Sequence, residues 1–190
     1  MALTRPREAA LLEAATRLFR ERGFHATSMQ DLAEALGMNR GSLYHYIAAK
    51  DDLLWRIVDG ALARLDAHVR PGLEAEGPGA VRLRRAIREH LRFAAVHADE
   101  LALLQIELRS LPPQRLAEII ARRDSYEAMW RAAMVAAVAE DGIGPVDVRL
   151  ATIAVLSACN WFTQWYRPDG PLGVDDIAER FADVFLGARR

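Results

Sequence analysis

The side chains with the clearest chemical capacity lie in a short stretch between residues 40 and 50. Five of them are polar and one is small: Arg40, Gly41, Ser42, Tyr44, His45 and Lys50. Arginine can donate two hydrogen bonds to one guanine, and serine, tyrosine and lysine can contact phosphates. Glycine lets the backbone approach another molecule closely. This combination predicts a surface that binds double-stranded DNA.

Two short helices joined by a glycine must position these side chains. Apolar residues recur at spacings of three and four over Met29, Leu32, Ala33 and Leu36, which predicts one apolar helix face. Gly37 suits the end of that helix, and Asn39 is a good N-cap for the next one. Residues 28–50 therefore predict a helix-turn-helix. A helical hairpin that only packs inside a bundle remains the alternative.

The common catalytic motifs are missing from the chain. It has no G-x-S-x-G elbow, phosphate-binding loop, dinucleotide fingerprint or H-E-x-x-H pair, so an enzyme is not expected. His90 and His97 lie seven residues apart, but neither follows a carboxylate at the Glu-x-x-His spacing. Cys159 is the single cysteine, which excludes an internal disulfide or a four-cysteine zinc site. We expect no metal and no cofactor.

Composition indicates a folded chain without a general affinity for anions. The 190 residues are 52% hydrophobic, and the net charge is −1. The first sixty residues carry eight basic and eight acidic side chains, so DNA affinity must come from local placement. No signal-peptide pattern begins the chain, and the longest apolar run, 150–159, is half of the ~20 residues that a membrane-spanning helix needs. We expect a soluble, cytoplasmic protein without a membrane partner.

Helical periodicity extends along the whole chain, and no segment shows the alternation of a strand. We therefore predict an all-α fold of about nine helices, with residues 1–50 as a DNA-binding domain and 51–190 as an effector-binding and dimerisation domain. The fourth helix should run from near Lys50 to about Val69 and end before the loop residues Pro71 and Gly72. The seventh should extend from Pro113 to about Glu140.

Two features of the second half could bind a ligand or be purely structural. The fifth helix carries Arg82, Arg84, Arg85, Arg88 and Arg92, which either form a solvated face or bind an anion. Asn160 lies among apolar residues and needs a partner, either another helix, a ligand or a second subunit. The aromatic residues Tyr126, Trp130, Trp161 and Trp165 could form core or, with Arg109 and Arg123, line a pocket.

The helix at 150–166 is apolar nearly all round, which predicts burial on two sides. One side should need a second copy of the chain. Together with the final amphipathic helix it predicts a four-helix interface in a homodimer, formed by Val155, Phe162, Ile177, Phe181 and Val184.

Residues 4–54 resemble the N-terminal domain of TetR-family transcriptional regulators. The shared motifs are LFRERGFHATSM, DLAEALGM and RGSLYHYIAAKDDLL, in the order and spacing of that family. The resemblance implies base contacts from Arg40, Gly41 and Ser42, and phosphate contacts from Tyr44 and Lys50. It also implies a contact to the DNA backbone from Thr27 or Ser28. Ile47 and Ala49 depart from the family pattern, which predicts a weaker cap of the fourth helix and a less firmly placed Lys50.

The second half resembles the ligand domains of TetR-family members that respond to acyl-CoA thioesters. The similar spans are ELRSLPPQRLAEIIARRDSYEAMW and NWFTQWYRPDGPLGVDDIAERFADVFLG. This resemblance implies a homodimeric repressor of a palindromic operator, released by a small-molecule effector. An acyl tail would lie among Trp130, Met134, Trp161 and Trp165, with Asn160 at the thioester carbonyl. A helical sensor or carrier that does not bind DNA is the alternative function, and an uncharacterised helical enzyme is a second one.

Overall fold

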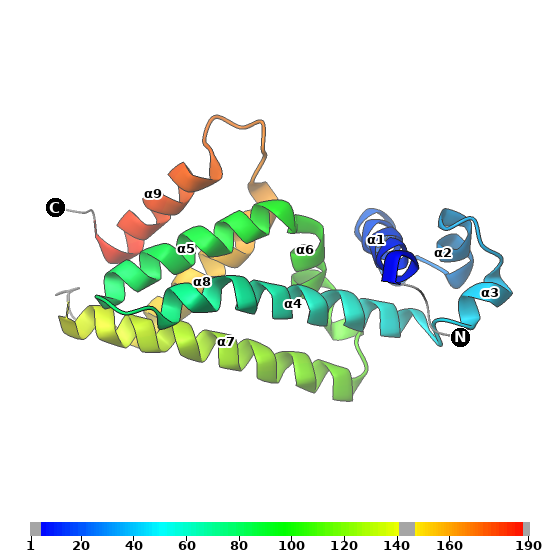
Figure 1. Ribbon diagram of the computed structural model, residues 1–190, viewed down its shortest axis with the longest axis horizontal. Helices are drawn as coiled ribbons and strands as arrows, with labels where there is room; N and C mark the ends of the chain where they lie inside the picture. The colour runs from blue at the N-terminus through cyan, green and yellow to red at the C-terminus, as the bar shows by residue number, and fades with distance from the viewer. Residues whose placement is uncertain (1–4, 141–146, 188–190) are drawn as a thin grey trace. The chain divides into compact units, whose positions relative to one another are not determined.

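The computed structural model describes residues 5–140 and 147–187, and Figure 1 shows that they form helices joined by loops. The elements are α1 (Arg5–Arg22), α2 (Met29–Ala35), α3 (Arg40–Tyr44), α4 (Lys50–Glu74), α5 (Gly79–Val96), α6 (Ala98–Ile106), η1 (Leu108–Ser110), α7 (Pro113–Glu140), α8 (Val148–Trp165) and α9 (Val174–Leu186). Nine α-helices, one 3-10 turn and no strand within this part of the chain confirm the predicted all-α fold.

Two compact units divide these helices. The first contains the residues up to Ala61 together with Asp99–Ile119, and the second contains Leu62–Ala98 and the residues after Ile119. Each of α4 and α7 contributes one part of its length to each unit. The predicted boundary near residue 50 remains a proposal, because the contacts define compact units and not functional domains.

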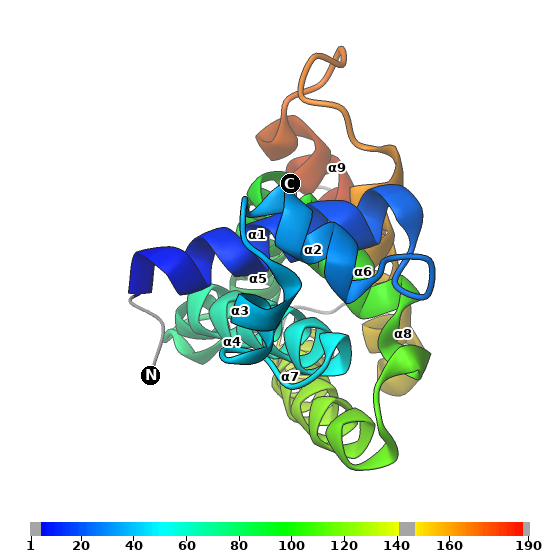
Figure 2. The same cartoon turned by 90° about the vertical axis from the view of Figure 1, so that its right-hand side faces the viewer.

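The first unit is built on α1, whose apolar face is buried. Leu11, Ala15 and Phe19 are each at most 2% exposed, and α2 packs on α1 and on α3 (Figure 2). Leu32 and Leu43 carry the apolar faces of α2 and α3 into the same core.

Local backbone and side-chain interactions fix the ends of the two short helices of this unit, α2 and α3. Gly37 follows α2 with a φ of 62°, a left-handed conformation that glycine adopts without strain. The Asn39 side chain accepts a hydrogen bond from the Ser42 backbone N–H at 2.7 Å and caps α3. Ser28 and Asp31 form a reciprocal capping box at the start of α2. The predicted helix-turn-helix is confirmed down to its glycine and its asparagine cap.

Helix α4 is longer than predicted, because it continues through Pro71 to Glu74. A proline in a helix removes one hydrogen bond and disfavours the preceding turn. Here Val69 and Leu73 lie one turn apart on either side of Pro71 and are 0% and 3% exposed. Burial of both side chains on one face favours continuing the helix past the proline.

The second unit packs α5 against α8 and α9. Leu83, Ile87 and Leu91 recur along α5 and are fully buried. Gly79, at the start of α5, allows the close approach of α7: a Cβ atom there would lie 2.1 Å from the Ala137 backbone nitrogen. Only glycine fits at this crossing.

The arginines of α5 pair with a row of carboxylates on α9. Arg84 contacts Asp183 and Glu179, Arg88 contacts Glu179, and Arg92 contacts Asp175 through two hydrogen bonds of 2.7 and 2.9 Å. These contacts follow a spacing of four residues on both helices and run in opposite directions, so they form an ion-pair ladder. Arg82 donates to the Leu73 carbonyl. The ladder therefore uses three of the five arginines internally, and phosphate binding by this face is not supported.

Candidate functional site

Helix α3 presents its polar side chains to solvent and its one apolar side chain to the core. Leu43 is fully buried, whereas Arg40, Gly41, Tyr44 and His45 are exposed. The Arg40 guanidinium donates a hydrogen bond of 3.1 Å to the Tyr44 hydroxyl and lies 5.5 Å from the centre of that ring. This contact holds the arginine along the exposed face of α3.

Of the two residues predicted to contact the DNA backbone before α2, the structure presents only Ser28. Thr27 is 1% exposed, and its hydroxyl donates within the fold, to the carbonyls of Gly23 at 2.9 Å and Leu18 at 3.3 Å. Ser28 is exposed and hydrogen-bonds Asp31, which lowers the pKa of that carboxyl. Thr27 is therefore a structural residue of the turn.

Lys50 is held firmly, contrary to the prediction drawn from Ala49. Its ammonium donates three hydrogen bonds to backbone carbonyls, at 2.7 Å to Phe24, 3.1 Å to His25 and 2.9 Å to Thr27. It also lies 4.5 Å from the centre of the Phe24 ring. An ammonium group has three hydrogens, and all three are used, so Lys50 has no donor left for a phosphate in this state.

The turn between α1 and α2, which Lys50 holds, is also held by Ser110 of η1 and by Glu107, the residue before η1. The Glu107 carboxylate accepts hydrogen bonds from the Phe24 backbone N–H at 3.3 Å and from the Ser110 hydroxyl at 3.1 Å. Ser110 also lies 3.0 Å from the His25 imidazole. Sequence reasoning missed this clamp, since these residues are 83 to 85 positions apart and carry no motif.

The start of α7 makes a further contact with α4 in the first unit. The Arg115 guanidinium lies 3.7 Å from the centre of the Trp55 ring and donates a hydrogen bond of 3.2 Å to Asp52. An arginine stacked on an indole in this way contributes both apolar contact and electrostatic attraction.

The residues predicted to bind the effector do not form one cluster. Tyr126, Trp130 and Met134 lie along one buried stripe of α7, whereas Arg123 on the same helix is exposed. Asn160 is half-buried on α8, and Trp161 and Trp165 are 63% and 45% exposed. Arg109 belongs to η1 in the first unit. The structure thus separates a buried aromatic group from a group at the surface.

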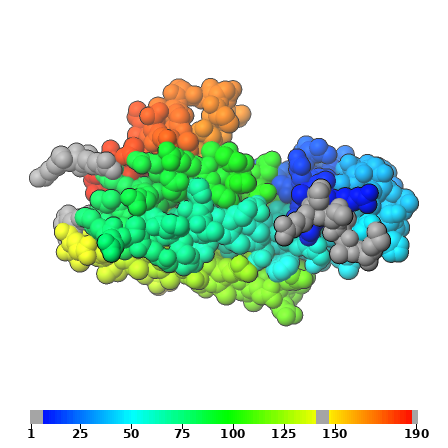
Figure 3. Space-filling view, in the orientation of Figure 1, coloured from blue at the N-terminus to red at the C-terminus, as the bar shows by residue number. Residues whose placement is uncertain are grey.

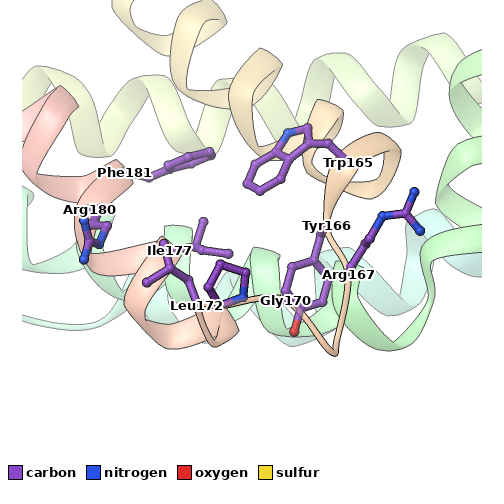
Figure 4. A pocket seen from close by; sticks show the side chains of 9 residues that line it. Trp165, Tyr166, Arg167, Gly170, Leu172, Ile177, Arg180 and Phe181 are labelled. Atoms are coloured by element: carbon purple, nitrogen blue, oxygen red, sulfur yellow. The ribbon is translucent and has the colours of Figure 1, made fainter.

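An open pocket of about 320 Å³ lies between the end of α8, the loop that follows it and α9. We name it the α8–α9 pocket. In Figure 4, Trp165 and Phe181 lie on one side, Ile177 and Leu172 lie opposite, and Arg167 and Arg180 lie at the two ends. The loop and α9 form the raised orange and red part of the second unit in Figure 3.

Buried Phe162 shapes this pocket from behind. Its ring stacks on Tyr166 with centres 4.4 Å apart and meets Trp165 edge-on at 5.3 Å. Sequence reasoning missed the pocket residues Tyr166, Arg167 and Arg180, although all three lie in the span that resembles ligand domains. An aromatic residue and an arginine directly before a Gly/Pro loop are the pattern that marks the first two.

The side chains predicted to form the dimer interface have very different exposure. Val155, Phe162 and Ile177 are at most 6% exposed within one chain, so they belong to its own core. Phe181 is half-buried, and Val184 is 78% exposed. The opposite face of α8 instead exposes large apolar side chains at helical spacing, namely Leu150, Ile153, Trp161 and Trp165.

The described residues contain no group of three side chains suited to hold a metal ion. His90 is buried and hydrogen-bonds Tyr126 at 3.1 Å, so it does not act as a free ligand. In the same part of the chain, none of the helices has the length and apolar character required to cross a bilayer.

Two family profiles match the chain. Residues 11–57 match the bacterial regulatory proteins of the tetR family, and residues 76–188 match the tetracyclin repressor-like C-terminal domain. The second match alone covers more than half of the chain.

Relatives and solved structures agree over nearly the full length. The transcriptional repressor KstR2 of Mycobacterium tuberculosis is 28% identical over 183 residues, which cover 95% of this chain and 92% of the repressor. The TetR-family regulator PfmR from Thermus thermophilus is 37% identical, with a TM-score of 0.85 over 95% of this chain and 99% of that one.

A third similar structure is AibR in complex with isovaleryl coenzyme A and operator DNA, which is 28% identical with a TM-score of 0.87 over 95% of this chain and 98% of AibR. The proteins named here are regulators and not enzymes, which confirms the expectation that this chain is not an enzyme. The same similarity to transcriptional regulators argues against the alternative of a helical carrier that does not bind DNA. The chain belongs to the TetR family of bacterial regulatory proteins.

Proposed function

We propose that this chain is a homodimeric transcriptional repressor that binds a palindromic operator and is released by a small-molecule effector. The observation that carries the proposal is the exposed polar face of α3, fixed by the Asn39 cap and by the buried Leu43. KstR2 supports repression as the function, and the AibR complex supports a system that combines operator DNA with an effector.

We call the first unit the DNA head. Some of its residues are proposed to contact DNA, and others stabilise its fold. Arg40, Gly41 and Ser42 begin α3 and are proposed to face base edges, while Tyr44 and His45 at its end contact the backbone. Ser28 contacts the backbone at the start of α2. Lys50 and Thr27 are reassigned to positioning, because their donors are used by carbonyls of the turn.

We infer that the homodimer forms through the exposed faces of α8 and α9. Leu150, Ile153, Trp161 and Trp165 make one stripe along α8, and Val184 adds an exposed apolar side chain on α9. Water-exposed apolar stripes of this kind mark surfaces that are buried in association. A two-fold axis would place the stripe of one subunit against that of its partner and would present the two α3 helices to successive half-sites.

An acyl-CoA thioester is the proposed effector, and the α8–α9 pocket is its proposed site. The pocket volume of about 320 Å³ is near the lower end of the roughly 300–1,000 Å³ typical of ligand sites, so it suits the acyl group and not the whole coenzyme. Arg167 and Arg180 at its ends can bind the coenzyme phosphates outside. AibR, whose complex contains isovaleryl coenzyme A, motivates the choice of ligand class.

A gel shift with the DNA upstream of the gene that encodes this chain tests the DNA-binding part. The intact protein should retard a palindromic fragment, and Arg40→Ala should weaken that band more than the band with random DNA. Lack of any sequence preference at low and moderate salt would contradict the proposal.

Acyl-CoA thioesters of increasing chain length, added to the same assay, test release. At least one should dissociate the complex, and Arg180→Ala should require more of it. Arg131→Ala, an exposed arginine on α7 outside the pocket, is the matched control. Equal loss in both variants would remove Arg180 from the site.

Analytical ultracentrifugation tests the dimer. Val184→Glu should shift the equilibrium to monomers, whereas Val96→Glu, which alters an equally exposed valine on α5, should not. A wild-type monomer at micromolar concentration would refute the homodimer.

A further inference from the structure

The DNA head contains a pocket of its own, with a volume of about 360 Å³. It lies between the first turns of α1, the turn that joins α2 to α3, and the residues that follow α3. Figure 2 shows these three helices. All residues that line the pocket belong to the first unit, so it is separate from the α8–α9 pocket. We name it the head pocket.

Apolar side chains contribute much of the lining of the head pocket. Leu11 on α1 and Leu43 on α3 are 2% and 0% exposed and belong to the core of the unit. Leu36 and Met38 are half-buried on either side of Gly37, whose left-handed φ of 62° turns the chain between α2 and α3. An apolar group that enters the pocket is therefore removed from water, which favours its binding.

Two polar side chains line the same pocket and lack a partner inside the protein. Arg7 on α1 and Tyr46 after α3 form no ion pair or side-chain hydrogen bond with any of the residues that the structure describes. Arg22, near the other end of α1, differs because it pairs with Asp31 at 2.9 Å. No carboxylate is among the described residues that line the pocket. Since an arginine is always charged, the lining carries an uncompensated positive charge.

The polar and apolar parts of the lining define a ligand with two matching parts. A guanidinium can donate two parallel hydrogen bonds to one carboxylate, and the Tyr46 hydroxyl can donate a further one. A small inorganic anion would use these donors but would leave the apolar side chains in contact with water. A hydrocarbon would cover the apolar side chains but would leave Arg7 unpaired. A single carboxylate attached to an apolar body uses both parts of the lining.

We propose that the head pocket is a second ligand site, for a small apolar monocarboxylate whose carboxylate binds Arg7 and Tyr46. The apolar body of the acid contacts Leu36 and Met38. The pocket volume is near the lower end of the roughly 300–1,000 Å³ typical of ligand sites, which suits a free acid of one or two rings and not its thioester with coenzyme A. The site shares no residue with the α8–α9 pocket.

Occupation of the head pocket should oppose operator binding, and this consequence rests on the proposed function. The pocket adjoins the residues that position α3, because Met38 directly precedes the Asn39 cap and Tyr46 follows the helix by two residues. The first sixty residues carry equal numbers of basic and acidic side chains, so one bound anion makes their net charge negative. A negative DNA head repels the phosphates of DNA. The acid would thus act on the DNA head directly.

Two probes of equal shape, 2-naphthoate and 2-naphthamide, test the proposal on the full chain without DNA. They share one ring system, and the first carries a carboxylate where the second carries a neutral amide. Isothermal titration calorimetry should show 2-naphthoate binding roughly two- to fivefold more tightly, the range expected for an ion pair with an exposed arginine. Equal affinities for the two probes, or no saturable binding of 2-naphthoate, would overturn the proposal.

Two matched pairs of variants on α1 locate the site. Arg7→Gln removes the charge and should abolish the preference for 2-naphthoate, whereas Arg17→Gln, at an exposed arginine outside the pocket, should keep it. Ala10→Phe fills the pocket and should weaken both probes, whereas Ala9→Phe, at an exposed alanine that does not line it, should not. All four positions are exposed, so the variants should fold. Wild-type affinities in either Arg7→Gln or Ala10→Phe would overturn the head pocket as the site.

Methionine methyl signals give a readout on the wild-type protein. In ¹H–¹³C spectra, the ring current of bound 2-naphthoate should move the signal of Met38, which lines the pocket. Met134 is buried in the second unit, and its signal should stay in place. A shift confined to Met134 would place the acid in the second unit and reject the head pocket.

The effect on DNA is measured separately, by fluorescence anisotropy with labelled operator. Saturating 2-naphthoate should weaken operator binding by the wild-type protein roughly two- to fivefold at low salt and less at high salt, and should leave Ala10→Phe unaffected. Unchanged operator affinity with the acid bound would overturn the regulatory effect. Failure to bind any operator would instead contradict the proposed function, and the calorimetric result would still decide whether the head pocket binds the acid.

Discussion

Replacement of Lys50 by methionine separates a positioning role from a phosphate contact. The change keeps an apolar stem of similar length and removes the ammonium that binds the carbonyls of Phe24, His25 and Thr27. Hydrogen bonds from charged donors contribute about 1.5–3 kcal/mol each when they are well buried. Because Lys50 is half-exposed and water competes for it, we discount this to about 1 kcal/mol per bond. We expect the free energy of unfolding to fall by about 2–3 kcal/mol.

Operator binding should also weaken, because the turn that the ammonium holds leads directly into the capped start of α2. The salt dependence distinguishes the two roles. A lost phosphate contact lowers the slope of log K against log salt concentration by about one per subunit, whereas a positioning residue leaves the slope unchanged. Fluorescence anisotropy with labelled operator over a range of salt concentrations measures this slope.

Two variants serve as controls for Lys50→Met. Lys50→Arg keeps the charge and should recover part of the stability. Tyr44→Phe removes an exposed hydroxyl and should leave stability within about 0.5 kcal/mol of wild type. Our reasoning would be refuted if Lys50→Met unfolded like wild type while its salt slope fell by about one per subunit.

Three further predictions concern separate parts of the chain. Arg40→Ala should cost ~1–3 kcal/mol at one base position of each half-site, measured with single-base operator variants. Glu179→Arg should destabilise the second unit by about 1–2 kcal/mol in urea unfolding, since it opposes Arg84 and Arg88, and high salt should reduce the loss. His90 has its usual pKa of 6.5 when unfolded and about 4 when folded, so its contribution is complete above pH 6.5 and is lost as the pH falls toward 4. About 1.4 kcal/mol should be lost by about pH 5.5, and His90→Gln should lack this part of the loss.

Local signals were sufficient for the helix-turn-helix. Gly37 and Asn39 act through their own backbone neighbours, so their types and positions determine where α2 ends and α3 begins. The start of α7 at Pro113 followed from proline punctuation in the same way. At Pro71 the local rule failed, because burial of Leu73 in the tertiary core outweighs the cost of the proline.

Contacts between distant segments could not be predicted from the sequence. Lys50 donates to backbone carbonyls and Glu107 accepts from the Phe24 backbone N–H, and backbone groups have no sequence pattern. A helix that is apolar nearly all round shows that both sides are buried or covered, but not which side faces its own core. For α8 the inward side carries Val155, and the exposed side carries Trp161. Pairing of Arg88 with Glu179 required knowledge that α5 and α9 are neighbours.

The clamp on the Phe24 turn shows that the DNA head is assembled from discontinuous sequence. The chain passes from one unit to the other after Ala61, after Ala98 and after Ile119. A fragment ending at Ala61 would lack Glu107 and Arg115, leaving the Phe24 amide without its acceptor and the Trp55 ring without its cation. Exchange of heads between relatives should therefore preserve specificity and folding only if the segment 99–119 is transplanted together with the N-terminal helices. In such chimeras the recombination points are set by the three crossings of the chain and not by the end of the helix-turn-helix.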